Sequence, residues 1–577
     1  MGEPFRPFAL PDRSAKSGAR LDSWKEIAAY LGRQVRTVQL WEKNEGLPVH
    51  RHQHARQGSV YAFTAELDEW RNARQSLAEL PSAAAADPSP RIPRRRILIG
   101  AALICVLGAI TAFLWTKRPR PAASVAAPTS VVVLPFLDLS PQKDQEYFSD
   151  GVTEEIIDAL SRVPNLRVVA RTSAFAFKGR NYDIREIGRQ LNVDSVLEGS
   201  VRRSADQFRI TAQLNRVSDG THFWSKTFDR PTKDIFAVQR EIAQAIAGQV
   251  RDVPRGDPTS DLDAYNLFQE GRYFFNEGTP DALVKASDRY QKAIERDPKF
   301  ALAYAGLADA NAYQAEHMYA APKDVMSKAK QDAEKAVALD DNLGEAHTAL
   351  GIVKLDYQWD RVGAQREFQT AMQLNPGSGY LHHWYAHSLE AQGHLDEALR
   401  EMRASLDLDP LSVMIRWDIA NELIMMRRYD EALEHIKKSL DLFPQHVLLL
   451  YFQGWAYHLK GEDPEAQRAL KSIRDADVPA QSPFGLTLSG LAAAWGGERA
   501  KASAIIAQLE RARSKQYVDA MLVTFLCSAL GDRDGLHLWF RRAYDEHASL
   551  FVYSPIMEGF YIPSGDAEVD RLIAKSR

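Results

Sequence analysis

The strongest hydrophobic pattern along the chain is a repeat with a period near 34 residues in its C-terminal half. Each copy holds a small residue, a mostly larger apolar residue four positions on, and in most copies a Pro or Asp at twelve. Because positions three to four apart share one face of a helix, each copy predicts a pair of packed amphipathic helices. The small positions of the six clear copies are Ala286, Ala329, Ala364, Ala398, Ala432 and Ala466.

This pattern resembles the tetratricopeptide repeat family, and two weaker copies follow around 490–509 and 521–543. We therefore expect an all-α tetratricopeptide superhelix over residues 260–577. The resemblance implies that the first helix of each pair lines a groove for a peptide or a protein partner. The alternative is that the aromatic side chains only pack between repeats. The implied groove residues are His383, His387, Trp417, Asn421, Tyr451 and Trp455.

Residues 20–76 combine helical and strand-like spacing, after a tail at 1–19 that we expect to be disordered. Ser23 and Glu26 form a capping-box pattern at the start of a short helix, and Gly32 ends it. A second helix is predicted from Val35. Two strand-like runs, 49–54 and 59–63, and a last helix to Trp70 follow.

The segments WKEIAAYLGRQVRTVQLWE, GLPVHRHQH and GSVYAFTAELDEW resemble the excisionase/MerR-like winged helix-turn-helix family. The resemblance implies that the second helix enters the major groove of DNA and that the strand pair contacts phosphate or the adjacent groove. Arg can read guanine and Gln can read adenine there. The implied DNA-binding residues are Gln34, Arg36, Thr37, Gln39 and Lys43 on the helix, and Arg51, His52 and Arg56 on the wing. Trp24, Trp41 and Trp70 are predicted core residues.

The charge of this segment is modest. Residues 20–74 carry nine basic and seven acidic side chains, a net charge of +2. One such domain would bind DNA weakly, so we expect a homodimer or tandem sites. A winged helix that binds protein instead is the alternative.

Residues 97–115 form a run of 19 residues without a charged side chain. About 20 apolar residues cross the hydrocarbon core of a bilayer. Linkers rich in Pro and Ala, at 77–96 and 116–129, offer no neighbouring element that would bury the run. It therefore predicts one transmembrane helix, and the small pair Gly108 and Ala112 would let two such helices pack closely.

Residues 130–252 alternate strand and helix patterns and then continue as three strands, which predicts a small α/β domain. The runs VVVLPFLDLS, EYFSDGVTEEIIDALS and YDIREIGRQLNVDSVLEGSVRR resemble a TolB amino-terminal-like (FlgO-like) domain. Glu154, Glu155 and Asp158 stand at helical spacing and are interpreted as a solvated helix face. The domain has no phosphate-binding glycine loop, HExxH or GxSxG motif, so no enzyme and no cofactor is predicted.

Candidate metal ligands are few. His383 and His387 stand four residues apart, as zinc ligands on a helix do, but no HExxH glutamate accompanies them. His50, His52 and His54 alternate on a predicted strand without a carboxylate or fourth ligand. We therefore predict no metal site. The two cysteines, Cys105 and Cys527, provide no disulfide framework.

The net charge of −4 over 577 residues excludes a wholly basic nucleic-acid binder, but it hides an asymmetry. Residues 1–129 carry a net charge of +8, which leaves −12 for residues 130–577. A basic DNA-binding part and an acidic sensor part would account for this contrast.

The combined prediction is a multidomain, membrane-anchored one-component transcription regulator of the bacterial inner membrane. Residues 20–76 would bind DNA in the cytoplasm, residues 97–115 would cross the membrane once, and the TolB-like and repeat regions would sense a ligand or protein partner in the periplasm. This layout resembles the CadC/ToxR class. The alternative is a membrane-anchored tetratricopeptide scaffold for protein complexes, in which the winged helix docks protein.

Overall fold

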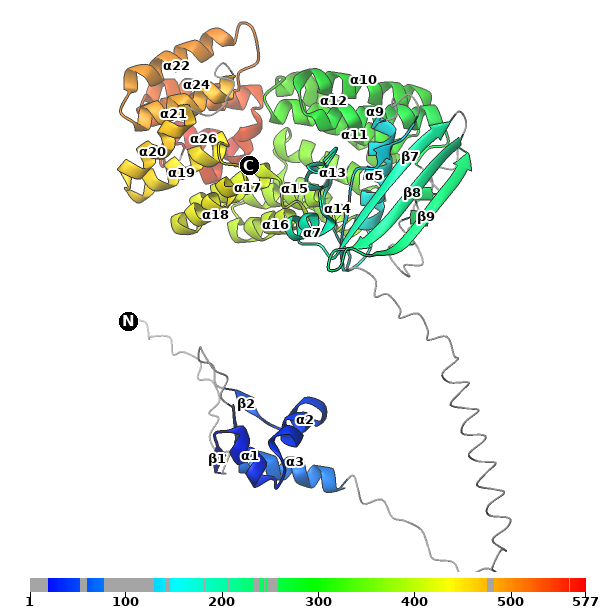
Figure 1. Ribbon diagram of the computed structural model, residues 1–577. Coiled ribbons are helices and arrows are strands. Elements are labelled where there is room, and N and C mark those ends of the chain that lie inside the picture. The colour runs from blue at the N-terminus through cyan, green and yellow to red at the C-terminus, as the bar shows by residue number, and fades with distance from the viewer. Residues whose placement is uncertain are drawn as a thin grey trace, which may run out of the picture. The chain divides into compact units, whose positions relative to one another are not determined.

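The computed structural model divides the chain into two compact units, within residues 1–120 and 121–577 (Figure 1). Each unit is described by itself. The residues that the structure describes are 19–51, 60–76, 129–140, 146–180, 182–204, 207–231, 238–239, 241–242, 245, 258–474, 482–559 and 561–576.

The described part of the first unit packs three helices against a three-stranded sheet of order β1-β3-β2. Ser23 caps the first helix, since its Oγ accepts a hydrogen bond from the backbone N–H of Glu26 at 3.2 Å. Gly32 adopts φ +62° in the turn between the first two helices, and Ile27 and Val38 pack into the core on either side of it. The elements are β1 (Arg20–Leu21), α1 (Trp24–Tyr30), α2 (Val35–Glu45), β2 (His50–Arg51), β3 (Val60–Phe63) and α3 (Thr64–Ser76).

The second unit begins with a six-stranded mixed sheet, whose main path runs β6-β4-β7-β8-β9. Strand β4 pairs in parallel with β6 and β7, whereas β7, β8 and β9 form an antiparallel meander. Strand β5 also pairs in parallel with β7. The strands are β4 (Ser130–Val133), β5 (Leu137–Asp138), β6 (Arg167–Val168), β7 (Ser195–Ser204), β8 (Gln207–Arg216) and β9 (His222–Pro231). The helices are α5 (Glu146–Ser161), α6 (Arg171–Phe175) and α7 (Ile184–Leu191).

Among the described residues, eight helix pairs follow, and they form a tetratricopeptide-like array. The pairs are α9 (Leu262–Glu277) with α10 (Pro280–Arg296), α11 (Ala301–Glu316) with α12 (Pro322–Leu339), α13 (Gly344–Asp356) with α14 (Arg361–Leu374), α15 (Gly379–Glu390) with α16 (Leu395–Leu408), α17 (Val413–Met425) with α18 (Tyr429–Leu442), α19 (Val447–Lys460) with α20 (Asp463–Arg474), α21 (Pro483–Trp495) with α22 (Arg499–Ala512), and α23 (Ala520–Leu530) with α24 (Arg533–Glu546).

The small residues of the repeat let the two helices of a pair approach closely. A Cβ on Gly271 would lie 2.6 Å from the ring of Tyr290, and one on Gly351 would lie 2.7 Å from the ring of Phe368. Both rings belong to fully buried or nearly fully buried side chains. The array ends with η2 (Ser549–Tyr553), α25 (Ser554–Met557) and α26 (Ala567–Lys575).

The predicted membrane helix requires a correction. Among the described residues, no helix combines the length and apolar character needed to cross a bilayer. The longest of them, α12, has 18 residues and carries charged side chains along its length, whereas a span needs about 20 mostly apolar residues. The fold class with a transmembrane helix and the inner-membrane location inferred from it are therefore not upheld. The run at 97–115 that suggested both, its two linkers and the tail at 1–18 lie outside the described residues.

The carboxylates of α5 are a second correction, because they do not form a solvated face. Glu154 is only 3% exposed and forms ion pairs with Arg171 at 2.6 Å and Arg272 at 2.8 Å. Arg272, on α9, also contacts Glu155 and Asp158. These contacts fasten the sheet-containing part to the first repeat, and the apolar core continues from one into the other.

Candidate functional site

Helix α2 presents a polar face in the first unit. Arg36, Gln39 and Lys43 follow one another at spacings of three and four residues and are all exposed, so they share one side of the helix. The opposite side is fixed by Val38, which is fully buried, and by Trp41. The ring of Trp41 lies 5.5 Å from that of Trp70 on α3. The core thus holds α2 in place and leaves the polar side chains outside.

The structure locates most of the other predicted DNA-binding residues. Gln34 is exposed at the N-cap of α2, and Thr37 is half-buried on the first turn. Arg51 belongs to β2, which pairs with β3. His52 and Arg56 lie outside the described residues. Among the described residues, neither Arg36 nor Lys43 forms an ion pair.

His50 has a structural role in this unit. Its Nε2 lies 2.7 Å from a carboxylate oxygen of Glu66, and its ring stacks on that of Tyr61 at 5.2 Å. His52 and His54, its companions in the histidine pattern, lie outside the described residues.

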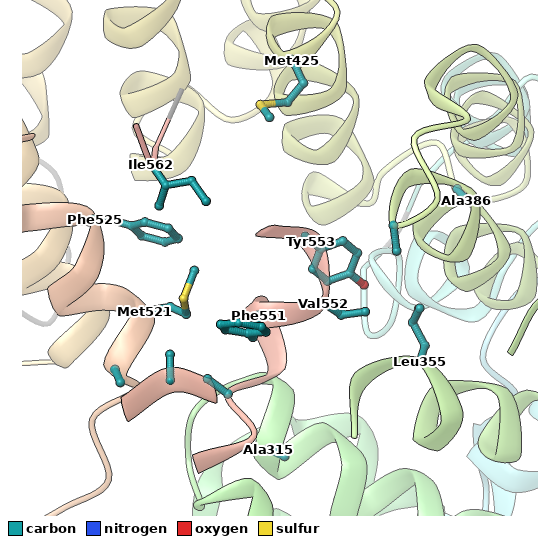
Figure 2. Close-up of a cluster of buried hydrophobic side chains, with 14 of the residues drawn as sticks. Ala315, Leu355, Ala386, Met425, Met521, Phe525, Phe551, Val552, Tyr553 and Ile562 are labelled. Atoms are coloured by element: carbon teal, nitrogen blue, oxygen red, sulfur yellow. The ribbon is translucent and has the colours of Figure 1, made fainter. Parts of the chain in front are cut away.

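The predicted groove of the repeats is filled by the chain's own C-terminal segment. We call residues 549–559 and 561–562 the closing segment and the helix surfaces that it contacts the inner face. Its Phe551, Val552 and Tyr553 lie among side chains of the second to fifth repeats and of α23, such as Leu355, Ala386, Met425 and Met521 (Figure 2). These contacts join the last repeat to the earlier ones.

Specific polar and aromatic contacts hold the closing segment in place. The ring of Phe551 lies 5.1 Å from that of Trp359, in the turn between α13 and α14. The guanidinium of Arg361 donates hydrogen bonds to the backbone carbonyls of Val552 at 2.7 Å and Ser576 at 2.8 Å. The segment is thus an integral part of the packed unit.

The six predicted groove residues differ in their access to solvent. His383, Tyr451 and Trp455 are at most 3% exposed, and the ring of Trp455 lies 4.4 Å from that of Tyr561. His387, Trp417 and Asn421 are half-buried. Trp455 therefore meets the protein's own closing segment where a partner was predicted, whereas the ring of Trp417 stacks on that of Phe452 at 6.1 Å.

A buried polar cluster lies on this inner face, between α15 and α17. Nε2 of His383 lies 2.8 Å from Oδ2 of Asp418 and 3.2 Å from Nε2 of His387. Nδ1 of His387 lies 2.9 Å from Oε2 of Glu390. Burial lowers the pKa of His383, whereas for His387 the carboxylates of Glu390 and Asp418 outweigh burial and raise its pKa to about 10.

Further carboxylates surround the cluster. Burial raises the pKa of Asp356 to about 7, that of Glu316 to about 8 and that of Glu422 to about 9. No described Lys or Arg forms an ion pair with any of the three. The site therefore concentrates buried acidic groups around two imidazoles.

Sequence reasoning found the two histidines of this cluster but missed their partners. Asp418 and Glu422 follow His383 and His387 by 35 positions, one more than the repeat period of 34. The period therefore pointed to Trp417 and Asn421, next to the residues that face the histidines. The pairing of a His-x3-His with an Asp-x3-Glu one repeat later was the available signal.

Comparisons with known proteins give partial similarities. No protein-family model matches the chain. Over 215 residues it is 37% identical to a Rhizobium meliloti (strain 1021) protein named "Putative adenylate cyclase 3", across 34% of this chain and 37% of that protein. Over 296 residues it is 24% identical to the transcriptional regulator HilA of Salmonella typhimurium, across 49% of this chain and 52% of HilA.

Among solved structures, the chain is similar to YrrB, described as a TPR protein with an unusual peptide-binding site. The identity is 21%, the coverage is 32% of this chain and 91% of YrrB, and the TM-score is 0.26. The chain spans about a third to a half of the length of the two curated relatives.

Proposed function

We propose that this protein is a transcription regulator that binds DNA through residues 20–76 and receives its signal through the second unit. Similarity to the regulator HilA over about half of the chain supports a regulatory role. The tetratricopeptide-like repeats support a protein partner for the second unit.

The observation that carries DNA binding is the polar face of α2. A helix that follows a short helix and a glycine turn, and that leaves one side free, has the arrangement of a recognition helix. In the proposed complex, Arg36 hydrogen-bonds the edge of a guanine, Gln39 contacts an adjacent base, and Lys43 contacts phosphate. Gln34 and Thr37 lie at the end of the helix that enters the groove first.

Selection of duplexes from a random library by the full-length protein tests this proposal. We expect a preferred sequence, and two half-sites within it would indicate a homodimer. Arg36→Ala should weaken binding to that sequence by about 5- to 150-fold, the equivalent of 1–3 kcal/mol, and relax the preference at one base pair. Lys25→Ala, which removes an exposed charge from α1, is the matched control.

A second candidate function is a protein scaffold in which α2 docks a protein. The exposed apolar residues of α2 favour it, since Leu40 is 50% exposed and Val35 is 37% exposed. The two functions predict different outcomes. If the protein is a scaffold, it selects no DNA sequence. Any weak DNA binding is then independent of sequence, with Arg36→Ala as with the wild type.

The repeats remain the proposed partner-binding part. Because the closing segment covers the inner face, a partner would bind the outer helices or displace that segment. No step of the proposal needs a cofactor or a catalytic group.

A further inference from the structure

Three potential metal ligands converge on the inner face. Nε2 of His383, Nε2 of His387 and a carboxylate oxygen of Asp418 all lie within 4.8 Å of one another. Two of these separations are 3.2 Å and 2.8 Å. Ligand atoms at about 2.0–2.1 Å from a tetrahedral zinc ion lie about 3.3 Å apart. The spacing is therefore close to that of a metal-binding set.

The hydrogen bonds among these atoms depend on which nitrogen of each imidazole carries the proton. Nε2 of His383 faces both the carboxylate of Asp418 and Nε2 of His387. It can donate a proton to the carboxylate or accept one from His387, but one nitrogen cannot do both. A cation between the three atoms would satisfy all of them at once.

The surroundings of the three atoms resemble the outer shell of a metal site. Glu390 contacts Nδ1 of His387, the nitrogen opposite to the one that faces the cluster. A carboxylate in that position orients a ligating imidazole and makes it a stronger ligand. His383 and His387 stand one turn apart on α15, and Asp418 and Glu422 stand one turn apart on α17.

The charge of the region also favours a cation. Glu422 and Asp356 are at most 4% exposed. Oε1 of Glu422 and Oδ1 of Asp356 are buried without a hydrogen-bond partner. Within the described ranges, no Lys or Arg forms an ion pair with Asp356, Asp418 or Glu422. Buried carboxylates without such partners are costly unless they take up a proton or a cation accompanies them.

We propose that His383, His387 and Asp418 bind a divalent first-row transition metal ion. Two imidazoles and carboxylate oxygen, without thiolate, suit Zn²⁺. The ion would link the fourth and fifth repeats below Tyr553, whose ring lies 5.8 Å from that of His387. The site would therefore tie the closing segment's position to metal occupancy.

Titration of the metal-free, full-length protein with ZnCl₂ against a competing chelator tests the site. We expect one tight Zn²⁺ per chain. His387→Gln and Asp418→Asn should each weaken it by more than about 100-fold, since loss of an outer-shell partner alone costs about 10- to 100-fold. Glu390→Gln should fall within that smaller range.

His382→Gln is the matched control. His382 lies on the same helix but contacts Glu401 and the carbonyl of Pro376, away from the cluster, so its loss should leave zinc affinity unchanged. Absence of a tight zinc site, or a site that survives both His387→Gln and Asp418→Asn, would overturn the proposal. The first result would indicate a metal-free histidine–carboxylate network, and the second a site elsewhere.

X-ray absorption of the zinc-loaded wild-type protein keeps the test independent of variant folding. We expect only nitrogen and oxygen ligands, at about 2.0–2.1 Å, including two imidazoles. A sulfur ligand at about 2.3 Å, or an imidazole count other than two, would contradict the assigned residues.

Discussion

The polar face of α2 and the inner face of the repeats were both predicted as binding surfaces from helical spacing and a family resemblance. In the structure they differ in exposure to solvent. In the first unit, Arg36 and Lys43 are exposed. In the second, Tyr451 and Trp455 are buried, and the closing segment lies against them. Helical spacing identifies the residues that share a face, but it does not show what covers that face.

The two surfaces also differ in chemistry. Charged and amide side chains on α2 gain little from being covered, because they are well solvated. The aromatic side chains of the inner face lose contact with water when the chain covers them. This burial stabilises the folded state by about 25 cal/mol per Å² of apolar surface. An apolar groove in a long solenoid is therefore a place where a distant part of the same chain can pack.

The largest expected effect comes from the closing segment. Phe551 is fully buried and packs on Trp359 and Phe540. Phe551→Ala should destabilise the second unit by about 3–5 kcal/mol through loss of apolar contact and the cavity it leaves. Calorimetric unfolding of the full chain measures this, and the transition of the first unit should not shift.

Leu538→Ala on α24 is the control for that experiment. Leu538 is 58% exposed, so its replacement should change stability by no more than about 0.5 kcal/mol. Equal effects of the two substitutions would mean that the closing segment does not pack on the inner face.

A smaller effect is expected between the helices of one repeat. Gly351→Ala places a Cβ 2.7 Å from the ring of Phe368 and should cost about 1–3 kcal/mol through overpacking. Gly344→Ala in the same helix is the control, because its Cβ would meet no atom nearer than 3.5 Å. Chemical unfolding monitored by circular dichroism compares the two. If both variants are as stable as the wild type, the helices of this pair do not approach so closely.

The smallest effect concerns pH. Burial lowers the pKa of His435 to about 4, and its Nε2 lies 2.9 Å from the carbonyl oxygen of Arg416. The pKa of a histidine is near 6.5 in the unfolded chain. The neutral, buried His435 therefore contributes fully to the free energy of unfolding of the second unit above about pH 6.5, and this contribution is lost as the pH falls toward 4. His435→Gln should therefore reduce the loss of unfolding free energy over that range by about 1–2 kcal/mol.

Unfolding titrations at pH 7 and pH 4 measure that difference, with His222→Gln on β9 as the exposed control. A loss of stability with acid that is the same in His435→Gln and wild type would show that His435 does not titrate in this range. The DNA affinity of the first unit should not depend on the substitution.

Local features of the sequence predicted local structure well. The cap at Ser23 and the helix that begins at Val35 were both expected, because their signals lie within a few residues of each other. The helix pairs of the repeats were predicted for the same reason. The helix pairs of residues 262–546 are tetratricopeptide-like in the structure as in the sequence.

Long-range contacts could not be predicted in this way. Glu154 was interpreted as solvated because its partner Arg272 lies on α9, far along the chain. The closing segment follows the last repeat without a periodic pattern that would indicate where it packs. In the polar cluster, Asp418 and Glu422 lie one residue beyond the repeat period from His383 and His387. The period therefore did not predict them as partners of the histidines. The roles of Arg36, Gln39 and Lys43 in DNA binding remain predictions.

The salt dependence of DNA binding tests the central claim most directly. The affinity of the full-length protein for its selected duplex is measured over a series of salt concentrations, for wild type and Lys43→Ala. We predict that the logarithm of the association constant falls linearly with the logarithm of the salt concentration, and that Lys43→Ala reduces the slope by about 0.9, the value for one phosphate contact. Binding without salt dependence, or the absence of binding to any duplex, would contradict the assignment of α2 as the DNA-binding helix.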